Sequence, residues 1–82
     1  MKKKAYKLTE AQKVFADLMK VEVKQAMSTD AGCIAKLIGK NEATVRLYMR
    51  GRIMDLTVAS VILTELRKLI ADREQFAMEY AA

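Results

Sequence analysis

The sequence contains no histidine, no proline and no tryptophan, and its only cysteine is Cys33. A single cysteine cannot form a disulfide within the chain, and one copy without histidine cannot supply the ligands of an ordinary zinc site. The sequence also lacks a phosphate-binding glycine run and a nucleophile with a recognisable base, so only scattered carboxylates and lysines remain for acid–base chemistry. We therefore expect a protein that is not an enzyme and that binds neither a metal nor a cofactor.

Glycine occurs only three times, and the chain has no run of about 18 uncharged apolar residues that could span a membrane. The lysines at the N-terminus are not followed by the apolar segment of a signal peptide. Abundant alanine, leucine, methionine, lysine and glutamate favour helix throughout. We expect one all-α domain of four to five helices over residues 1–82, located in the cytoplasm, with Cys33 as a small buried apolar residue.

The charge is unevenly distributed along the chain, although the total is only +5. Residues 1–52 contain 12 lysines and arginines against 5 acidic residues, a balance of +7, whereas residues 53–82 contain 3 against 5, a balance of −2. A positive surface attracts a polyanion such as DNA, because each neutralised phosphate releases condensed counterions. Charge alone does not separate a nucleic-acid-binding protein from a basic protein of another kind.

Residues 31–51 (AGCIAKLIGKNEATVRLYMRG) have the pattern of two short helices joined by a tight turn. Apolar residues recur at helical spacing from Ile34 to Ile38 and stop at Gly39. Glycine enters a left-handed backbone conformation without steric cost, so Gly39 is suited to end the first helix sharply. Asn41 then stands where an N-cap is needed for a second helix over residues 42–50.

The second helix of this motif is amphipathic. At helical spacing, one side carries Val45, Tyr48 and Met49 and is expected to pack against the rest of the domain. The opposite side should be free; it carries Ala43, Arg46, Leu47 and Arg50.

This stretch resembles the helix-turn-helix of the lambda-repressor-like (Cro/cI-type) transcriptional regulators. The resemblance covers about twenty residues and rests on a small residue, a turn glycine and a set of buried apolar positions: Ala35, Gly39, Ile34, Ile38, Val45 and Tyr48. Lys40 departs from the family, which usually has an apolar residue there. The resemblance implies a prokaryotic or phage regulator, most often a repressor, that acts in the bacterial cytoplasm or nucleoid. An ordinary helical hairpin of a small bundle is the alternative interpretation.

Roles in DNA binding can be assigned to the residues around the second helix. Arg46 and Arg50 can each bond O6 and N7 of guanine, and either could instead bond phosphate. Leu47 can contact a thymine methyl, and Glu42 can accept from a cytosine amino group. The expected base-contacting residues are Glu42, Ala43, Arg46, Leu47 and Arg50, and the expected phosphate-contacting residues are Lys36, Lys40, Thr44 and Arg52. Glu42 could instead stabilise the helix dipole, and Leu47 could be a packing or dimer contact.

The segments before the motif are a basic arm and a first helix. Residues 1–8 carry four lysines and are interpreted as a flexible arm, either merely solvated or lying along DNA. Thr9 and Gln12 form a capping box that starts a helix, which should end between Val23 and Met27. Its expected core stripe is Ala11, Val14, Phe15, Leu18 and Val21, with Met19 and Ala26 at its margins. Asp30 is the expected N-cap of the first motif helix.

Residues 55–82 can form one long C-terminal helix, because they contain neither glycine nor proline. Asp55 is its expected N-cap, and a break near Asp72 is possible. The helix carries a wide apolar stripe, Ile62, Leu63, Leu66, Leu69 and Ile70, which Phe76 and Tyr80 prolong. The stripe could fold back on the first helix or form a two-fold dimer seam, and we expect a homodimer.

Two functions from different classes follow from these observations. The first is a sequence-specific regulator that binds double-stranded DNA in the major groove, with half-sites about 34 Å apart if it is dimeric. The second is a protein-interaction adaptor that acts through the apolar C-terminal helix. Charge changes at Arg46 and Arg50 would abolish the first function and leave the second intact, whereas polar changes at Leu63 and Leu66 would abolish the second.

Overall fold

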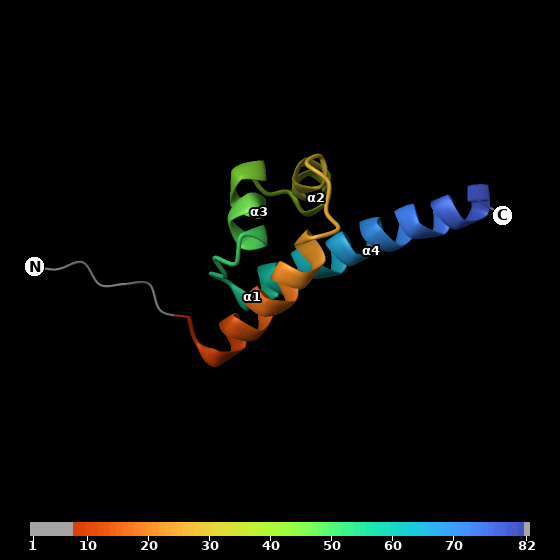
Figure 1. The fold of residues 1–82 in the computed structure, drawn as a ribbon. Helices are drawn as coiled ribbons and strands as arrows, with labels where there is room; N and C mark the ends of the chain where they lie inside the picture. Colours follow the sequence, from red (N-terminus) through yellow and green to blue (C-terminus); the bar gives the residue numbers. More distant parts are fainter. Residues whose placement is uncertain (1–7, 82) are drawn as a thin grey trace, which may run out of the picture.

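A computed structural model describes residues 8–81 of the chain, which form four helices and no strand (Figure 1). The helices are α1 (Glu10–Val23), α2 (Asp30–Ile38), α3 (Glu42–Met49) and α4 (Leu56–Ala81). The expectation of an all-α fold with a long C-terminal helix is confirmed. Almost all of the predicted basic arm, residues 1–7, lies outside the described residues.

Short-range capping interactions set three of the helix starts where the sequence predicted them. At α1, the hydroxyl of Thr9 accepts from the Gln12 N–H at 3.2 Å, and the Gln12 side chain accepts from the Thr9 N–H at 2.8 Å. At α4, one carboxylate oxygen of Asp55 accepts from the N–H groups of Thr57 and Val58. Such bonds satisfy amides that have no partner within the helix. The third helix start, that of α3, is capped by Asn41.

The helices are arranged as a pair, α2 and α3, that packs against α1 and the first part of α4 (Figure 1). The buried side chains at their junction include Met19 from α1, Ile34 from α2, Val45 from α3 and Leu66 from α4, each fully inaccessible to solvent. Tyr48 of α3 is also buried, and its hydroxyl accepts from the backbone N–H of Asp55 at 2.9 Å. The core therefore fixes the position of α3 against both of the longer helices.

The predicted core stripe of α1 is largely wrong. Val14, Leu18 and Val21 are 55%, 37% and 58% exposed, and Ala11 is exposed as well; only Phe15 packs against the core. The face that packs carries Phe15, Ala16, Met19 and Val23, of which Met19 was expected only at the margin of the stripe. The helix has two apolar faces, and helical periodicity alone does not say which of them meets α3 and α4.

The apolar stripe of α4 is covered by the same chain. Ile62, Leu63, Leu66 and Ile70 are at most 6% exposed, and Leu69 is partly buried against the core. The assignment of these five residues to a dimer seam is therefore wrong for this fold, because a side chain already buried within one copy cannot cover a second. The other interpretation considered, that the stripe packs on the first helix, is the one observed.

Helix α4 continues without a break through Asp72 to Ala81, and its last part extends past the other helices (Figure 1). Phe76, Met78 and Tyr80 are between 60% and 76% exposed there. The rings of Phe76 and Tyr80 contact each other, with centroids 4.6 Å apart.

Asp30 does not act as the N-cap of α2; its buried carboxylate forms an ion pair with the partly exposed Arg73. The N-cap position belongs to Thr29, whose side chain makes no capping bond. The Asp30 carboxylate, 2% exposed as a residue, is bound by Arg73 of α4 through two nitrogens at 2.9 and 3.0 Å and by the N–H of Met27 at 2.9 Å. Arg73 also donates to the carbonyl of Gln25 at 3.0 Å. The pair joins α4 to the connection between α1 and α2.

Candidate nucleic-acid interface

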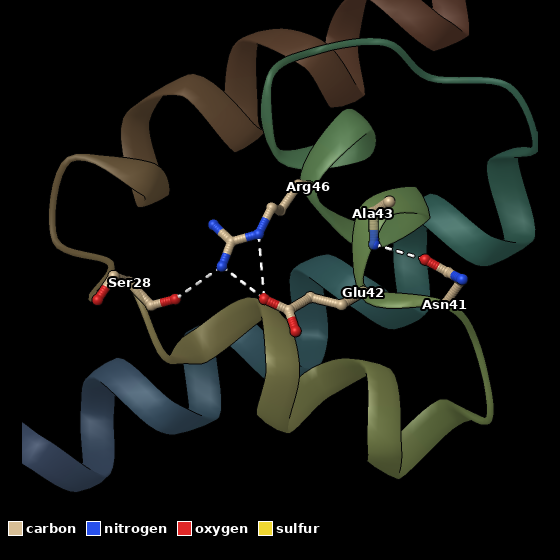
Figure 2. Close-up of polar contacts among 5 residues, drawn as sticks. All are labelled: Ser28, Asn41, Glu42, Ala43 and Arg46. Atoms are coloured by element: carbon tan, nitrogen blue, oxygen red, sulfur yellow. Dashed lines mark hydrogen bonds and ion pairs between the residues drawn. The ribbon is translucent and has the colours of Figure 1, made fainter.

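The turn between α2 and α3 has the geometry that the sequence predicted. Gly39 ends α2 in the left-handed conformation, at φ 69° and ψ 34°, and the N–H of Lys40 bonds back to the carbonyl of Ala35 at 2.9 Å. A Cβ added at Gly39 would meet nothing within 4 Å, so glycine is favoured there by backbone conformation rather than by space. Asn41 then caps α3 by accepting from the N–H of Ala43 at 2.7 Å (Figure 2).

Helix α3 has one buried and one exposed side, as predicted. Val45 and Tyr48 are buried and Met49 is partly buried, whereas Ala43, Arg46 and Arg50 are exposed. Leu47 lies between the two sides and is half-buried. A helix held on one side by the core and open on the other has the shape needed to enter a DNA major groove.

Arg46 is held in place by groups on two elements (Figure 2). Its Nε and Nη2 atoms both contact Oε2 of Glu42, one turn earlier in α3, and Nη2 also donates to the carbonyl of Ser28 at 3.2 Å. The side chains of this ion pair are 45% and 49% exposed, so the pair is in contact with water. Ser28 precedes α2, and its carbonyl therefore ties α3 to the start of the motif.

The carboxylate of Glu42, at the start of α3, lies next to Gly32 of α2. A Cβ added to Gly32 would stand 3.4 Å from Oε1 of Glu42, which is ordinary van der Waals contact. A shallow groove between the starts of α2 and α3 is lined by Ser28, Thr29, Gly32, Cys33, Lys36, Glu42 and Arg46. Cys33 is exposed in this groove, so the expectation that it is buried is wrong.

Arg50 occupies the end of α3 and differs from Arg46. Its side chain is exposed and makes no hydrogen bond or ion pair with other residues in the range 8–81. It borders a cleft that Val23 and Ala26 line on one side and Met49 on the other. Of the two arginines, Arg50 is the one whose guanidinium can bind a ligand without breaking an existing contact.

The residues predicted to contact phosphate are distributed over two sides of the motif. Lys36 lies on the groove that contains Glu42 and Arg46. Lys40 stands at the turn and borders a second, more apolar groove between α2 and α4, together with Val61 and Glu65. Lys36, Lys40 and Arg52 are exposed and Thr44 is half-buried. The fold brings Lys36 next to the exposed side of α3 and places Lys40 in the turn that precedes this helix.

The contact with Ser28 was not predicted from the sequence. Ser28 and Arg46 are 18 positions apart, and the contact uses a backbone carbonyl, which every residue has. The i, i+4 spacing of Glu42 and Arg46, in contrast, is a recognised pattern for an ion pair on one helix face.

Comparison of the chain with models of known protein families, with curated proteins and with solved structures gives no match. Within residues 8–81, no group of three or more acidic or cysteine side chains is arranged to hold a metal ion. None of the four helices in this range combines the length and the apolar character needed to cross a membrane. The function must therefore be inferred from the residues and geometry of the motif.

Proposed function

We propose that this protein is a sequence-specific, double-stranded DNA-binding regulator of transcription that reads the major groove with α3. The observation that supports the proposal most is the exposed side of α3, which displays two arginines from a helix fixed by a glycine turn, an N-cap and a buried opposite side. The basic character of residues 1–52 adds attraction for phosphate. By resemblance, the setting is a phage or bacterial cytoplasm and the effect is repression.

The ion pair between Arg46 and Glu42 does not prevent base recognition by Arg46. An exposed i, i+4 ion pair on a helix is worth about 0.3–0.5 kcal/mol, whereas a bidentate contact from arginine to guanine contributes about 1–3 kcal/mol of discrimination. The ion pair with Glu42 is therefore weak enough for Arg46 to exchange it for a guanine edge. Before DNA is bound, Glu42 and Ser28 keep the guanidinium of Arg46 near the first turns of α3. This is the part of a recognition helix that lies closest to the bases.

The remaining predicted residues have supporting roles in this proposal. Ala43 and Leu47 present apolar surface beside Arg46 that can contact a thymine methyl. Lys36, Lys40, Thr44 and Arg52 are proposed to bind phosphates, which orients the protein on the duplex but does not specify sequence. Arg50, near the end of α3, can reach either a guanine or a phosphate.

The proposal is tested by selection of bound sites from random duplex DNA with the native protein and with an Arg46→Ala, Arg50→Ala double variant. A matched control, Arg67→Ala, Lys68→Ala, removes two cations of α4 whose ion pairs are with Glu22 and Glu65 and not with residues of α3. We expect the native protein and the control to enrich one site. The α3 variant should lose the enrichment but keep weak, salt-dependent binding. Equal enrichment by all three proteins, or by none, contradicts the proposal.

A second candidate, a protein-interaction function of α4, is favoured by the exposed aromatic residues at its end. Phe76 and Tyr80 lie beyond the core and are 60% and 76% exposed. Because Leu63 and Leu66 are buried, polar changes there would unfold the protein and give no information on binding. Substitutions at Phe76 and Tyr80 are the discriminating ones: they abolish activity if α4 is an adaptor, and leave DNA binding intact if α3 is the site.

A further inference from the structure

Helix α1 carries an apolar stripe on its solvent side that the core does not use. The stripe consists of Ala11, Val14, Leu18 and Val21, spaced by three, four and three residues. This spacing is that of the a and d positions in a coiled-coil seam. All four residues are exposed, with Val14 at 55% and Val21 at 58%. Single exposed apolar residues are common on protein surfaces, but a regular seam on one helix is a feature of helix pairing.

We propose that α1 pairs in antiparallel orientation with α1 of a second copy of this chain. Across a two-fold axis beside the middle of the helix, Val14 of each copy lies opposite Leu18 of the other, and Ala11 lies opposite Val21. In antiparallel helix pairs an a position faces a d position, and this register satisfies that rule at all four layers. A small residue meets a larger one at each end, so the seam is complementary to itself, as a two-fold interface must be.

The charged residues beside the stripe fit the same register. Glu10 and Lys24 flank the seam on the same side, one at each end of α1. In the antiparallel pair, Glu10 of one copy lies next to Lys24 of the other, and the two-fold axis repeats this contact. Both residues are exposed, and neither has an ion-pair partner within residues 8–81. Asp17, at the centre, faces its own equivalent, a like-charge contact that limits the affinity.

The stripe lies opposite the part of α1 that meets α3. Two residues mark the side of α1 that faces α3. The Cβ of Ala16 would lie 3.8 Å from a Cβ built at Gly51, and Val23 lines a cleft together with Met49. Across the proposed dimer, the helices therefore follow in the order α3 and α1 of one copy, then α1 and α3 of the second copy. Three successive interaxial distances of 8–10 Å put the two α3 helices roughly 24–30 Å apart. That is about 4–10 Å shorter than one turn of DNA, about 34 Å. This last relation rests on the proposed function, whereas the pairing itself does not.

The contact is small, so the dimer is expected to be weak. A stable interface commonly buries about 800 Å² on each partner, more than one short helix stripe supplies. We expect a dissociation constant between about 1 µM and about 1 mM. Two adjacent half-sites on DNA would raise the effective concentration of the second copy and make such a dimer sufficient.

The pairing is tested without DNA, by sedimentation equilibrium from about 1 µM to about 1 mM, a range chosen to bracket weak dimers. The native chain should change from monomer to dimer across the range, and Val21→Glu should stay monomeric with an unchanged circular dichroism spectrum. The matched control is Leu37→Glu, another exposed apolar position, 65% exposed and on α2, which should dimerise like the native chain. A native chain that remains monomeric throughout, or a Val21→Glu variant that dimerises normally, overturns the proposal.

Charge exchange tests the register. Glu10→Lys and Lys24→Glu should each weaken self-association by roughly 3- to 30-fold, because two rim pairs change from attraction to repulsion. In an equimolar mixture of the two variants, both rim pairs become attractive again, so a mixed dimer should form with nearly native affinity. The absence of a mixed dimer overturns the antiparallel register. Destabilisation of α1 cannot mimic this result, since mixing does not repair a damaged helix. Because no DNA is present, failure here is distinct from failure of the DNA-binding proposal.

Discussion

At the scale of single residues, the contact between Asp30 and Arg73 has the clearest energetic consequence. Burial of the Asp30 carboxyl raises its pKa, but the hydrogen bond from Arg73, the hydrogen bond from the Met27 N–H and the charge of Arg73 together outweigh burial and lower the pKa below its ordinary value of 3.8. A group whose pKa is lowered by folding stabilises the folded state where it is ionised, and the stabilisation is lost as the pH falls through the folded pKa. For Asp30 the loss therefore occurs below about pH 4.

The lowered pKa of Asp30 predicts how the stability of the protein changes in acid. An Asp30→Asn variant should be less stable than the native chain at neutral pH by about 1–3 kcal/mol, because a charged acceptor is removed from Arg73, which is itself about one-third exposed and screened by water. The difference should shrink as the pH falls below about 4, where Asp30 of the native chain takes up a proton. Urea unfolding at a series of pH values measures it. A difference that stays constant down to pH 2.5 would show that the ionised carboxylate is not responsible.

The residue scale also shows which contacts a sequence reveals. The caps at Thr9, Asn41 and Asp55 were predictable, because each side chain bonds a backbone N–H two or three positions later. Asp30 was wrongly predicted as a cap by the same local rule, since its partner Arg73 is 43 positions away. Only the packing of α4 against the connection between α1 and α2 brings these two together.

At the scale of elements, α1 and α4 were predicted as helices from their patterns, but the buried face of α1 was assigned wrongly, and the sequence left open what covers the apolar face of α4. Helix α1 has apolar residues on two sides, and the one with the more regular spacing faces solvent. For α4 the same stripe was compatible with an intrachain core and with the expected dimer seam, and burial of Ile62 and Leu66 within one copy assigns it to the core. A helix pattern defines which residues share a face; what covers that face is a property of the tertiary fold.

The two parts of α4 should respond differently to substitution. Leu66 is fully buried, so Leu66→Ala should cost about 2–5 kcal/mol of the free energy of unfolding through lost burial and a cavity. Phe76 is 60% exposed beyond the core, so Phe76→Ala should change it by less than about 0.5 kcal/mol. Urea unfolding of both variants provides the comparison. Comparable losses for the two would mean that the end of α4 packs within the folded domain.

At the scale of the whole molecule, charge and geometry combine in a way that the sequence only partly showed. The basic part of the chain, residues 1–52, contains the motif, and its division from the acidic part was visible in the sequence. The exposure of α3 and its glycine turn were predicted as well. The engagement of Arg46 with Glu42 and Ser28 was not, because it depends on how α3 sits against the start of α2. The candidate interface thus contains Arg46, whose guanidinium contacts Glu42 and Ser28, and Arg50, which is exposed and without a partner among residues 8–81.

The most direct test of the central proposal is a thermodynamic cycle between Arg46 and the guanines of the selected site. Each guanine is replaced in turn by 7-deazaguanine, which lacks the N7 acceptor, and the affinities of the native protein and of Arg46→Ala are measured at one salt concentration. At one guanine, the replacement should weaken native binding by roughly 5- to 150-fold, equivalent to about 1–3 kcal/mol. It should have little further effect on the variant, because the two changes remove the same contact. Additive losses at every guanine would contradict the assignment of Arg46 as a base-reading residue on α3.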